Sequence, residues 1–283
     1  MRNSRESRSS SIVSIDSAWH DYRGRAVLVT GGTKGLGLAI GLQFGKRGAH
    51  VTLTQKWGSA DAGEIADAFA KVGAPPPHIV DADASQDDDT RAVLAGIRER
   101  HDRLDALISN VAFAPLVKSV EDYTRRGLAT AIEYSTWPIV SYTRMTHELF
   151  GHYPRYVIGM SSEGADSYHV NYDIVAAAKA ALEALCRYLN HRIRDTGSRV
   201  NAVRTRFVST ESLRATFGDE FEPFVEKHSP GVFTTPDEVA SAVFGLCSGL
   251  ADGIGGQVIT VDRGAAIFEN FSRLFDERDR GTL

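Results

Sequence analysis

The chain has 283 residues, of which 42% are hydrophobic and 24% are charged, and its formal net charge at pH 7 is −4. This balance is typical of a soluble protein with one core, and it gives no case for nucleic acid or an anionic membrane as partner. No apolar run approaches 18 residues, so the sequence predicts no membrane-spanning segment.

Short apolar runs alternate with longer amphipathic stretches along the chain. The runs predict strands at 25–30, 50–54, 78–82, 105–109, 155–160, 199–203 and 257–261. Helical patterns include those at 35–47, 61–72, 87–101, 120–150, 172–194 and 236–248. Apolar strands that alternate with helices favour a parallel sheet that is covered on both faces. The predicted fold is therefore α/β: a single-domain, Rossmann-type, doubly wound sheet of seven parallel strands flanked by helices on both faces.

We predict one domain over residues 21–267, with an N-terminal tail at 1–20 and a C-terminal tail at 268–283. The first residues are rich in arginine and serine, which indicates a disordered tail, and a targeting or regulatory role is the alternative. The segment 204–235 breaks the alternation and carries several phenylalanines among charges. It is typical of a flexible lid over a site, or of a helical pair that packs on a neighbouring subunit.

The two cysteines, Cys186 and Cys247, each lie in an apolar helical pattern. Buried free thiols are expected there, which fits a reducing cytoplasm. The nine histidines are scattered and no metal-ligand spacing is present, so we expect no metal site.

A glycine-rich segment, "TGGTKGLG" at 30–37, follows the first predicted strand and opens the first predicted helix. Glycines 31, 35 and 37 let the backbone turn tightly and approach a pyrophosphate, which the N-terminus of the helix can bind. The position of this pattern at the first strand–helix junction predicts a dinucleotide site.

The end of the second predicted strand indicates which dinucleotide binds. An NAD site has a carboxylate there for the ribose 2′-hydroxyl, but this sequence reads "LTQKWGS" with neither Asp nor Glu. Lys56 in this segment and Lys34 in the glycine segment suit a 2′-phosphate instead. The cofactor is therefore predicted to be NADPH.

The stretch "NYDIVAAAK" at 171–179 places Tyr172 seven residues before Lys179. On a helix this separation returns two side chains to nearly the same face. A tyrosine hydroxyl beside a fixed ammonium is suited to proton donation. The alternative is that Tyr172 only caps or packs the start of the helix.

From about residue 22 to 267 the chain resembles the short-chain dehydrogenase/reductase family. The motifs that carry this resemblance are "TGGTKGLG", "DAD" at 81–83, "SNVA" at 109–112, "MSS" at 160–162, the Tyr172/Lys179 pair, and "GGQVITVDRG" at 255–264. In the family a tyrosine normally precedes the lysine by four positions, where this chain has Val175. The spacing of seven is similar to that of enoyl-acyl-carrier-protein reductases, in particular those that keep the ordinary glycine motif and use NADPH.

The resemblance implies the roles of the site residues. Tyr172, Lys179 and Ser162 would be catalytic, with Lys179 also binding the ribose of the nicotinamide and Ser162 bonding to substrate or to Tyr172. Asp83 would contact the adenine, and Thr210 would hold the nicotinamide carboxamide. The full set expected to bind the cofactor is Gly31, Thr33, Lys34, Gly35, Leu36, Gly37, Lys56, Asp83, Ala84, Asn110, Val111, Lys179, Val208 and Thr210. The family's helix asparagine aligns with Ser135, Tyr168 would share or border the pocket, and His169 would be solvated.

The function implied is reduction of an enoyl thioester by NADPH. Hydride goes to the β-carbon, so the oxygen that gathers negative charge lies farther from the carbon that accepts hydride than it does in a ketone. Moving the tyrosine from four to seven residues before the lysine shifts its backbone position by about 4.5 Å along a helix, which fits this longer distance. A carbonyl reductase is the first alternative, since Arg204 and Arg206 in the substrate segment, with Thr205-Arg206 where the family has Pro-Gly, leave room for an acidic or aromatic substrate. A non-catalytic NADP(H)-binding protein is the second. The substrate would be small or carrier-bound, and a cytoplasmic homodimer or homotetramer is implied.

Overall fold

The computed structural model describes residues 21–56, 60–267 and 269–279, and the predicted tail at 1–20 lies outside them. Seven parallel strands form one sheet in the order β3-β2-β1-β4-β5-β6-β7. The strands are β1 Ala26–Val29, β2 His50–Gln55, β3 His78–Asp81, β4 Ala106–Ser109, β5 Tyr156–Ser162, β6 Arg199–Thr205 and β7 Val258–Val261. Every predicted strand is present, and the predicted seven-stranded, doubly wound single sheet is confirmed.

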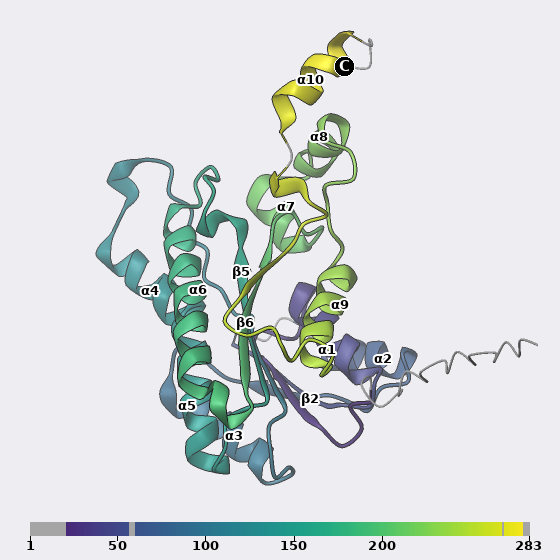
Figure 1. Cartoon of the computed structure of the whole chain (residues 1–283), viewed down its shortest axis with the longest axis vertical. Coiled ribbons are helices and arrows are strands. Elements are labelled where there is room, and N and C mark those ends of the chain that lie inside the picture. Colours follow the sequence, from purple (N-terminus) through teal and green to yellow (C-terminus); the bar gives the residue numbers. More distant parts are fainter. Residues whose placement is uncertain (1–20, 57–59, 268, 280–283) are drawn as a thin grey trace, which may run out of the picture.

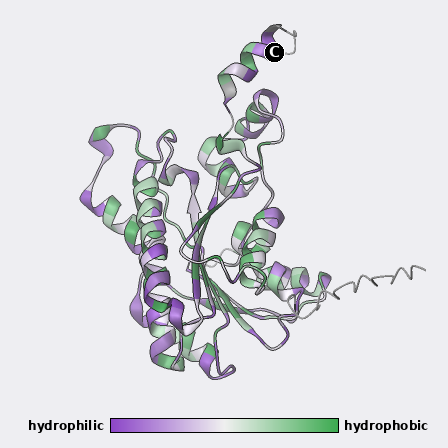
Figure 2. Cartoon of the chain, viewed as in Figure 1, coloured by the Kyte–Doolittle hydropathy of each residue, from purple (hydrophilic) through white to green (hydrophobic). Residues whose placement is uncertain are grey.

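Helices cover both faces of this sheet (Figure 1). One layer contains α1 (Gly35–Gly45), α2 (Ala62–Lys71) and α9 (Pro236–Cys247), and the other contains α3 (Asp87–Arg98), α4 (Arg125–Ser135), α5 (Trp137–Phe150) and α6 (Asp173–Ile193). Two large apolar clusters fill the space between sheet and helices, one on each face, and residues of the central strands contribute to both. Hydrophobic residues recur along these strands and the helices that cover them (Figure 2). Burial on both faces is why the central strands β1 and β4 are almost wholly apolar.

The predicted helical pattern at 120–150 is wrong as a single element, because it divides into the short 3-10 turn η2 (Val120–Asp122), α4 and α5. The break is at Thr136, whose backbone has φ −122° and ψ −52°. Its hydroxyl donates to the carbonyl oxygen of Ala178 on α6, at 2.8 Å. Pro138 follows in the first turn of α5, where a proline is tolerated because its missing N–H would lack a helical partner anyway.

The segment predicted as a lid contains α7 (Glu211–Phe217) and α8 (Phe221–His228). Its aromatic side chains pack on one another: the ring of Phe207 lies 5.4 Å from that of Phe221 and 5.7 Å from that of Phe233. Beyond it, α10 (Asn270–Asp279) forms in the predicted C-terminal tail and extends away from the sheet (Figure 1). Closure of the segment 204–235 over the site, and its packing on a neighbouring subunit, both stay predictions.

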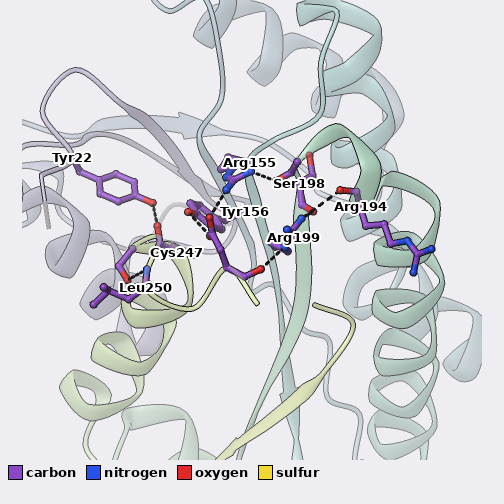
Figure 3. Close-up of polar contacts among 11 residues, drawn as sticks. Tyr22, Arg155, Tyr156, Arg194, Ser198, Arg199, Cys247 and Leu250 are labelled. Atoms are coloured by element: carbon purple, nitrogen blue, oxygen red, sulfur yellow. Dashed lines mark hydrogen bonds and ion pairs between the residues drawn. The ribbon is translucent and has the colours of Figure 1, made fainter. Parts of the chain in front are cut away.

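A polar network lies at the end of the sheet where the central strands β5 and β6 begin (Figure 3). Arg155 forms an ion pair with Asp252, and the hydroxyl of Tyr156 donates to the same carboxylate at 2.9 Å. Arg199 donates to the carbonyl oxygen of Asp252 at 2.6 Å, and Tyr22 donates to that of Cys247 at 2.5 Å. These groups tie β5 and β6 to the loop before β7.

Candidate active site

The loop between β1 and α1 is shaped for close approach by a ligand. Gly31 and Gly35 have φ values of +60° and +51°, in the region that only glycine adopts readily. A Cβ on Gly37 would lie 2.2 Å from the carbonyl oxygen of Gly31, so no side chain fits there. The backbone N–H groups that begin α1 are thereby exposed to a phosphate group.

Asn110, just after β4, braces this loop. Its side-chain amide donates to the carbonyl oxygens of Thr30 and Gly31, at 3.2 and 2.9 Å. Its backbone N–H donates to the hydroxyl of Thr30 at 3.0 Å. The carboxyl ends of two neighbouring strands are therefore joined where a dinucleotide is expected to bind.

A cavity of about 630 Å³ lies beside the loop, a size that accommodates a small-molecule ligand. Most of the residues predicted to bind the cofactor line it. They are Gly31, Thr33, Lys34, Gly35, Leu36, Gly37, Lys56, Ala84, Asn110, Val111 and Thr210. Asp83, Val208 and the three predicted catalytic residues are not among its lining residues.

Several lining residues were not predicted. They are Thr54, Gln55, Ala82, Ala112, Phe113, Tyr134, Glu211 and Ala215. Thr54 and Gln55 belong to the end of β2, where an NAD site has its carboxylate, so the position indicated them. Nothing in the sequence pattern indicated Tyr134, because it reaches the cavity from α4.

The end of the cavity beside β2 contains an ion pair. Nζ of Lys56 lies 2.5 Å from Oδ2 of Asp83, and Gln55 donates to Asp81 at 2.9 Å. Burial by itself lowers the pKa of Lys56, but hydrogen bonds to Asp83 and Tyr134 outweigh this effect and raise the pKa. Burial likewise opposes the lowering of the pKa of Asp83, and hydrogen bonds from Lys56 and Ser85 outweigh it. Both groups are therefore charged at neutral pH.

Thr210 and Val208 lie on the segment after β6. The hydroxyl of Thr210 caps α7 by accepting from the N–H of Leu213 at 3.2 Å, and its side chain also faces the cavity. Val208 is buried and forms an isolated parallel bridge with Thr234. The two residues therefore anchor the lid segment beside the cavity, and a contact with nicotinamide stays a prediction.

Tyr172 does not belong to α6 but is the residue that precedes it, with φ −103° and ψ 8°. Its ring packs directly on the backbone of Gly164, where a Cβ would lie 2.5 Å from a ring carbon. Burial raises the pKa of Tyr172, and a hydrogen bond with Ser162 opposes this. The phenol is therefore neutral, and able to donate, at physiological pH.

Lys179 lies on α6 and is only 4% exposed. Its Nζ donates to the carbonyl oxygen of Met160 at 2.7 Å. Burial lowers the pKa of Lys179 to about 8, against the opposing effect of Glu183 and Cys186. Tyr172 and Lys179 are thus both tied to the end of β5, the tyrosine through Ser162 and the lysine through Met160.

The other positions near the pair have distinct environments. Val175, at the family's usual tyrosine position, is 1% exposed, and Ser135 accepts from the N–H of Phe113 at 3.0 Å. Tyr168 is 83% exposed, which favours a place at the rim. The ring of His169 lies 6.2 Å from that of Tyr172 and its Nε2 is 3.6 Å from the buried carboxylate of Glu163, so the expectation that it is simply solvated is wrong.

The two arginines of the substrate segment are both paired with acids. Arg204 binds Glu183 through two hydrogen bonds and also pairs with Asp166. Nε of Arg206 lies 2.9 Å from Oε2 of Glu163, an ion pair without hydrogen-bond alignment. Their charge is compensated within the protein, which removes the reason to expect an acidic substrate.

Known proteins resemble this chain in sequence and in fold. Residues 31–266 match the family model described as enoyl-(acyl carrier protein) reductase. The NADH-dependent enoyl-[acyl-carrier-protein] reductase of Aquifex aeolicus is 29% identical over 261 residues, which are 88% of this chain and 94% of that protein. A tropinone reductase homologue of Arabidopsis thaliana is 32% identical over 253 residues, which are 87% of this chain and 92% of that protein.

The solved structures give the same fold. A 7α-hydroxysteroid dehydrogenase, in complex with NADH and 7-oxoglycochenodeoxycholic acid, superposes with a TM-score of 0.78 at 22% identity, and the match covers 88% of this chain and 97% of that chain. Among the described residues, no group of three or more His, Cys, Asp or Glu side chains is placed to hold a metal ion. Within the same residues, no helix combines the length and the apolar character needed to cross a membrane.

Proposed function

Because the chain belongs to the short-chain dehydrogenase/reductase family and is therefore an oxidoreductase, we propose that it reduces an enoyl thioester with NADPH. One observation carries the choice of substrate. Val175 is buried where the family places its tyrosine, and Tyr172, before the first turn of α6, is held beside Ser162 instead. The donor is thus displaced along the chain from its usual place.

The proposal of NADPH rests on the adenosine end of the cavity. β2 ends without a carboxylate at Gln55, and Lys56 and Lys34 both line the cavity. The Aquifex aeolicus relative is named for NADH, so cofactor preference is a property to be measured for this chain. The glycine loop and the N-terminus of α1 would hold the pyrophosphate, and Lys56 would hold the 2′-phosphate.

Tyr172 would stabilise the enolate. A bound nicotinamide cofactor would supply hydride to the β-carbon of the substrate. The π electrons of the C=C bond would move towards the thioester oxygen, and the resulting enolate would take a proton from water at its α-carbon. In that enolate, negative charge collects on the thioester oxygen, and a neutral phenol placed in a partly buried site donates a hydrogen bond to it. Ser162 orients that phenol, and the ring's packing on Gly164 limits its movement.

Lys179 would act as the buried cation of the site. Its ammonium sits against the carbonyl of Met160, and from there it would bind the ribose hydroxyls of the nicotinamide half. Its charge at neutral pH follows from its pKa of about 8.

The proposal is tested by following NADPH oxidation with crotonyl thioesters and with a panel of ketones. We expect turnover with the enoyl thioester, and a fall of about a hundredfold or more in kcat for Tyr172→Phe, as for loss of an oxyanion donor. Undiminished activity in Tyr172→Phe contradicts the role of the tyrosine. Turnover only with ketones contradicts the substrate, and NADPH binding without any turnover supports a non-catalytic protein.

A carbonyl reductase is the second candidate, because the Arabidopsis thaliana relative is named as a tropinone reductase homologue. The compensated charges of Arg204 and Arg206 favour a neutral rather than an acidic substrate in that case. The ketone panel therefore needs neutral and aromatic members.

We also infer that the protein assembles as a homodimer or homotetramer in the cytoplasm. Support for assembly comes from large apolar side chains exposed on α4, α5 and α6: Leu128 is 43%, Trp137 40% and Tyr188 71% exposed. The free, buried Cys186 and Cys247 suit a reducing compartment. Light scattering measures the oligomeric state directly.

A further inference from the structure

Three side chains from separate elements meet at the adenosine end of the cavity. Lys56 follows β2, Asp83 follows β3, and Tyr134 lies on α4. The hydroxyl of Tyr134 donates to Oδ2 of Asp83 at 3.1 Å, and Nζ of Lys56 lies 2.5 Å from the same oxygen. Lys56 also bonds to the hydroxyl of Tyr134, and its Nζ lies 4.6 Å from the centroid of the ring.

Tyr134 is the rigid member of this cluster. It is half-buried near the end of α4, and its ring lies 6.1 Å from that of Phe113. The next residue, Ser135, is 2% exposed and bonds to the N–H of Phe113. A tyrosine has two side-chain torsions to fix, whereas the flexible stem of lysine has four, so Tyr134 can position the ammonium of Lys56.

The hydroxyl of Tyr134 also affects how strongly Asp83 holds the lysine. Oδ1 of Asp83 accepts from the N–H and the hydroxyl of Ser85, at 3.0 and 2.8 Å, and Oδ2 accepts from Tyr134. The negative charge is therefore shared among several donors. Without the hydroxyl of Tyr134, Asp83 would depend more on Lys56 and would draw the ammonium away from a phosphate group.

We propose that Tyr134 is a specificity-determining residue. It holds the ammonium of Lys56 at the adenosine end of the cavity and so favours the 2′-phosphate of NADPH over the 2′-hydroxyl of NADH. This inference rests on the dinucleotide site of the proposed function and adds a residue that no motif assigns. The ammonium is in place before the cofactor arrives, so less conformational freedom is lost on binding.

The test measures dissociation constants for NADPH and NADH by calorimetry, without substrate. The variants are Tyr134→Phe, Lys56→Gln and the double variant, with Tyr153→Phe, whose ring stacks on His147 away from the cavity, as the matched control. We expect Tyr134→Phe to weaken NADPH about five- to tenfold and NADH less than about twofold, the size of a lost charge-assisted contact. Because Tyr134 acts through Lys56, the double variant should bind NADPH no more weakly than Lys56→Gln alone.

Two results overturn the inference alone: an unchanged NADPH/NADH ratio in Tyr134→Phe, or a double variant that loses further NADPH affinity beyond Lys56→Gln. Wild-type protein that prefers NADH overturns both this inference and the NADPH part of the proposed function. Turnover of ketones rather than enoyl thioesters overturns only the proposed substrate, because the binding measurements contain none.

Discussion

Arg204 on β6 and Glu183 on α6 form a bidentate pair, with Nε–Oε1 and Nη2–Oε2 distances of 2.9 and 2.7 Å. The side chains are 14% and 6% exposed. Ser161 donates a further hydrogen bond to Glu183 at 2.7 Å. The pair thus joins the helix that carries Lys179 to two strands of the sheet, and the arginine serves the protein rather than a substrate.

Replacing Arg204 by methionine should destabilise the protein strongly. The change leaves the Glu183 carboxylate buried without its cation, which costs about 3–5 kcal/mol, whereas Arg204→Met combined with Glu183→Leu should recover most of this loss. Urea unfolding measures the free energies. Arg91→Ala is the control, since its pair with Glu148 is about half exposed and is worth at most about 1 kcal/mol. A loss for Arg204→Met as small as that of the control contradicts the prediction.

Gly164→Ala should lower kcat without weakening NADPH. The added Cβ would lie 2.5 Å from the ring of Tyr172, so the ring must leave the position in which its hydroxyl bonds to Ser162. We expect a fall in kcat of about tenfold or more, since small displacements of a catalytic group are costly. Gly96→Ala on α3, where a Cβ meets nothing within 4 Å, should leave kcat unchanged. Equal kcat for both variants would show that the ring is not held by Gly164.

The pH dependence of kcat/KM for NADPH should fall on the alkaline side with an apparent pKa near 8. This parameter reports groups of the free enzyme, in which burial lowers the pKa of Lys179 to about 8. Below that pH the ammonium is charged and active, and above it the charge is lost. In Lys179→Arg the guanidinium stays charged, so the residual activity should not decline there. A decline near pH 8 that persists in Lys179→Arg belongs to another group.

Lys179→Met should stabilise the cofactor-free protein at pH 7. Lowering the pKa from 10.5 to about 8 corresponds to about 3 kcal/mol of destabilisation by the buried charge, and losing the bond to Met160 offsets about 1 kcal/mol. In the unfolded protein Lys179 keeps its proton up to about pH 10.5, whereas in the folded protein it loses the proton above about pH 8. The unfolded state therefore binds more protons between these two pH values, and the free energy of unfolding of the wild type rises there. The advantage of Lys179→Met, measured by denaturant unfolding, should therefore shrink as pH rises through that window. A difference in the free energy of unfolding between Lys179→Met and the wild type that stays constant at all pH values contradicts this prediction.

The sequence predicted the elements well because their signals are local. Apolar runs, amphipathic periodicity and glycine positions are properties of neighbouring residues. The break between α4 and α5 was missed although Pro138 is a local signal of it, and the hydrogen bond from Thr136 to Ala178, which joins segments 42 residues apart, could not be read from the sequence. Tyr134 was missed for the same kind of reason: it reaches Asp83 from 51 residues away.

By itself the sequence determined the order of strands and helices, the glycine loop and the seven-residue spacing of Tyr172 and Lys179. These features depend on backbone conformation and on apolar periodicity, which each short segment expresses alone. Only the tertiary structure decided that Arg204 and Arg206 face buried acids, that Tyr172 stands against Gly164, and that Tyr134 meets Lys56 and Asp83. Charge compensation and side-chain contact depend on distances between separate elements, and packing the helices on the sheet sets those distances.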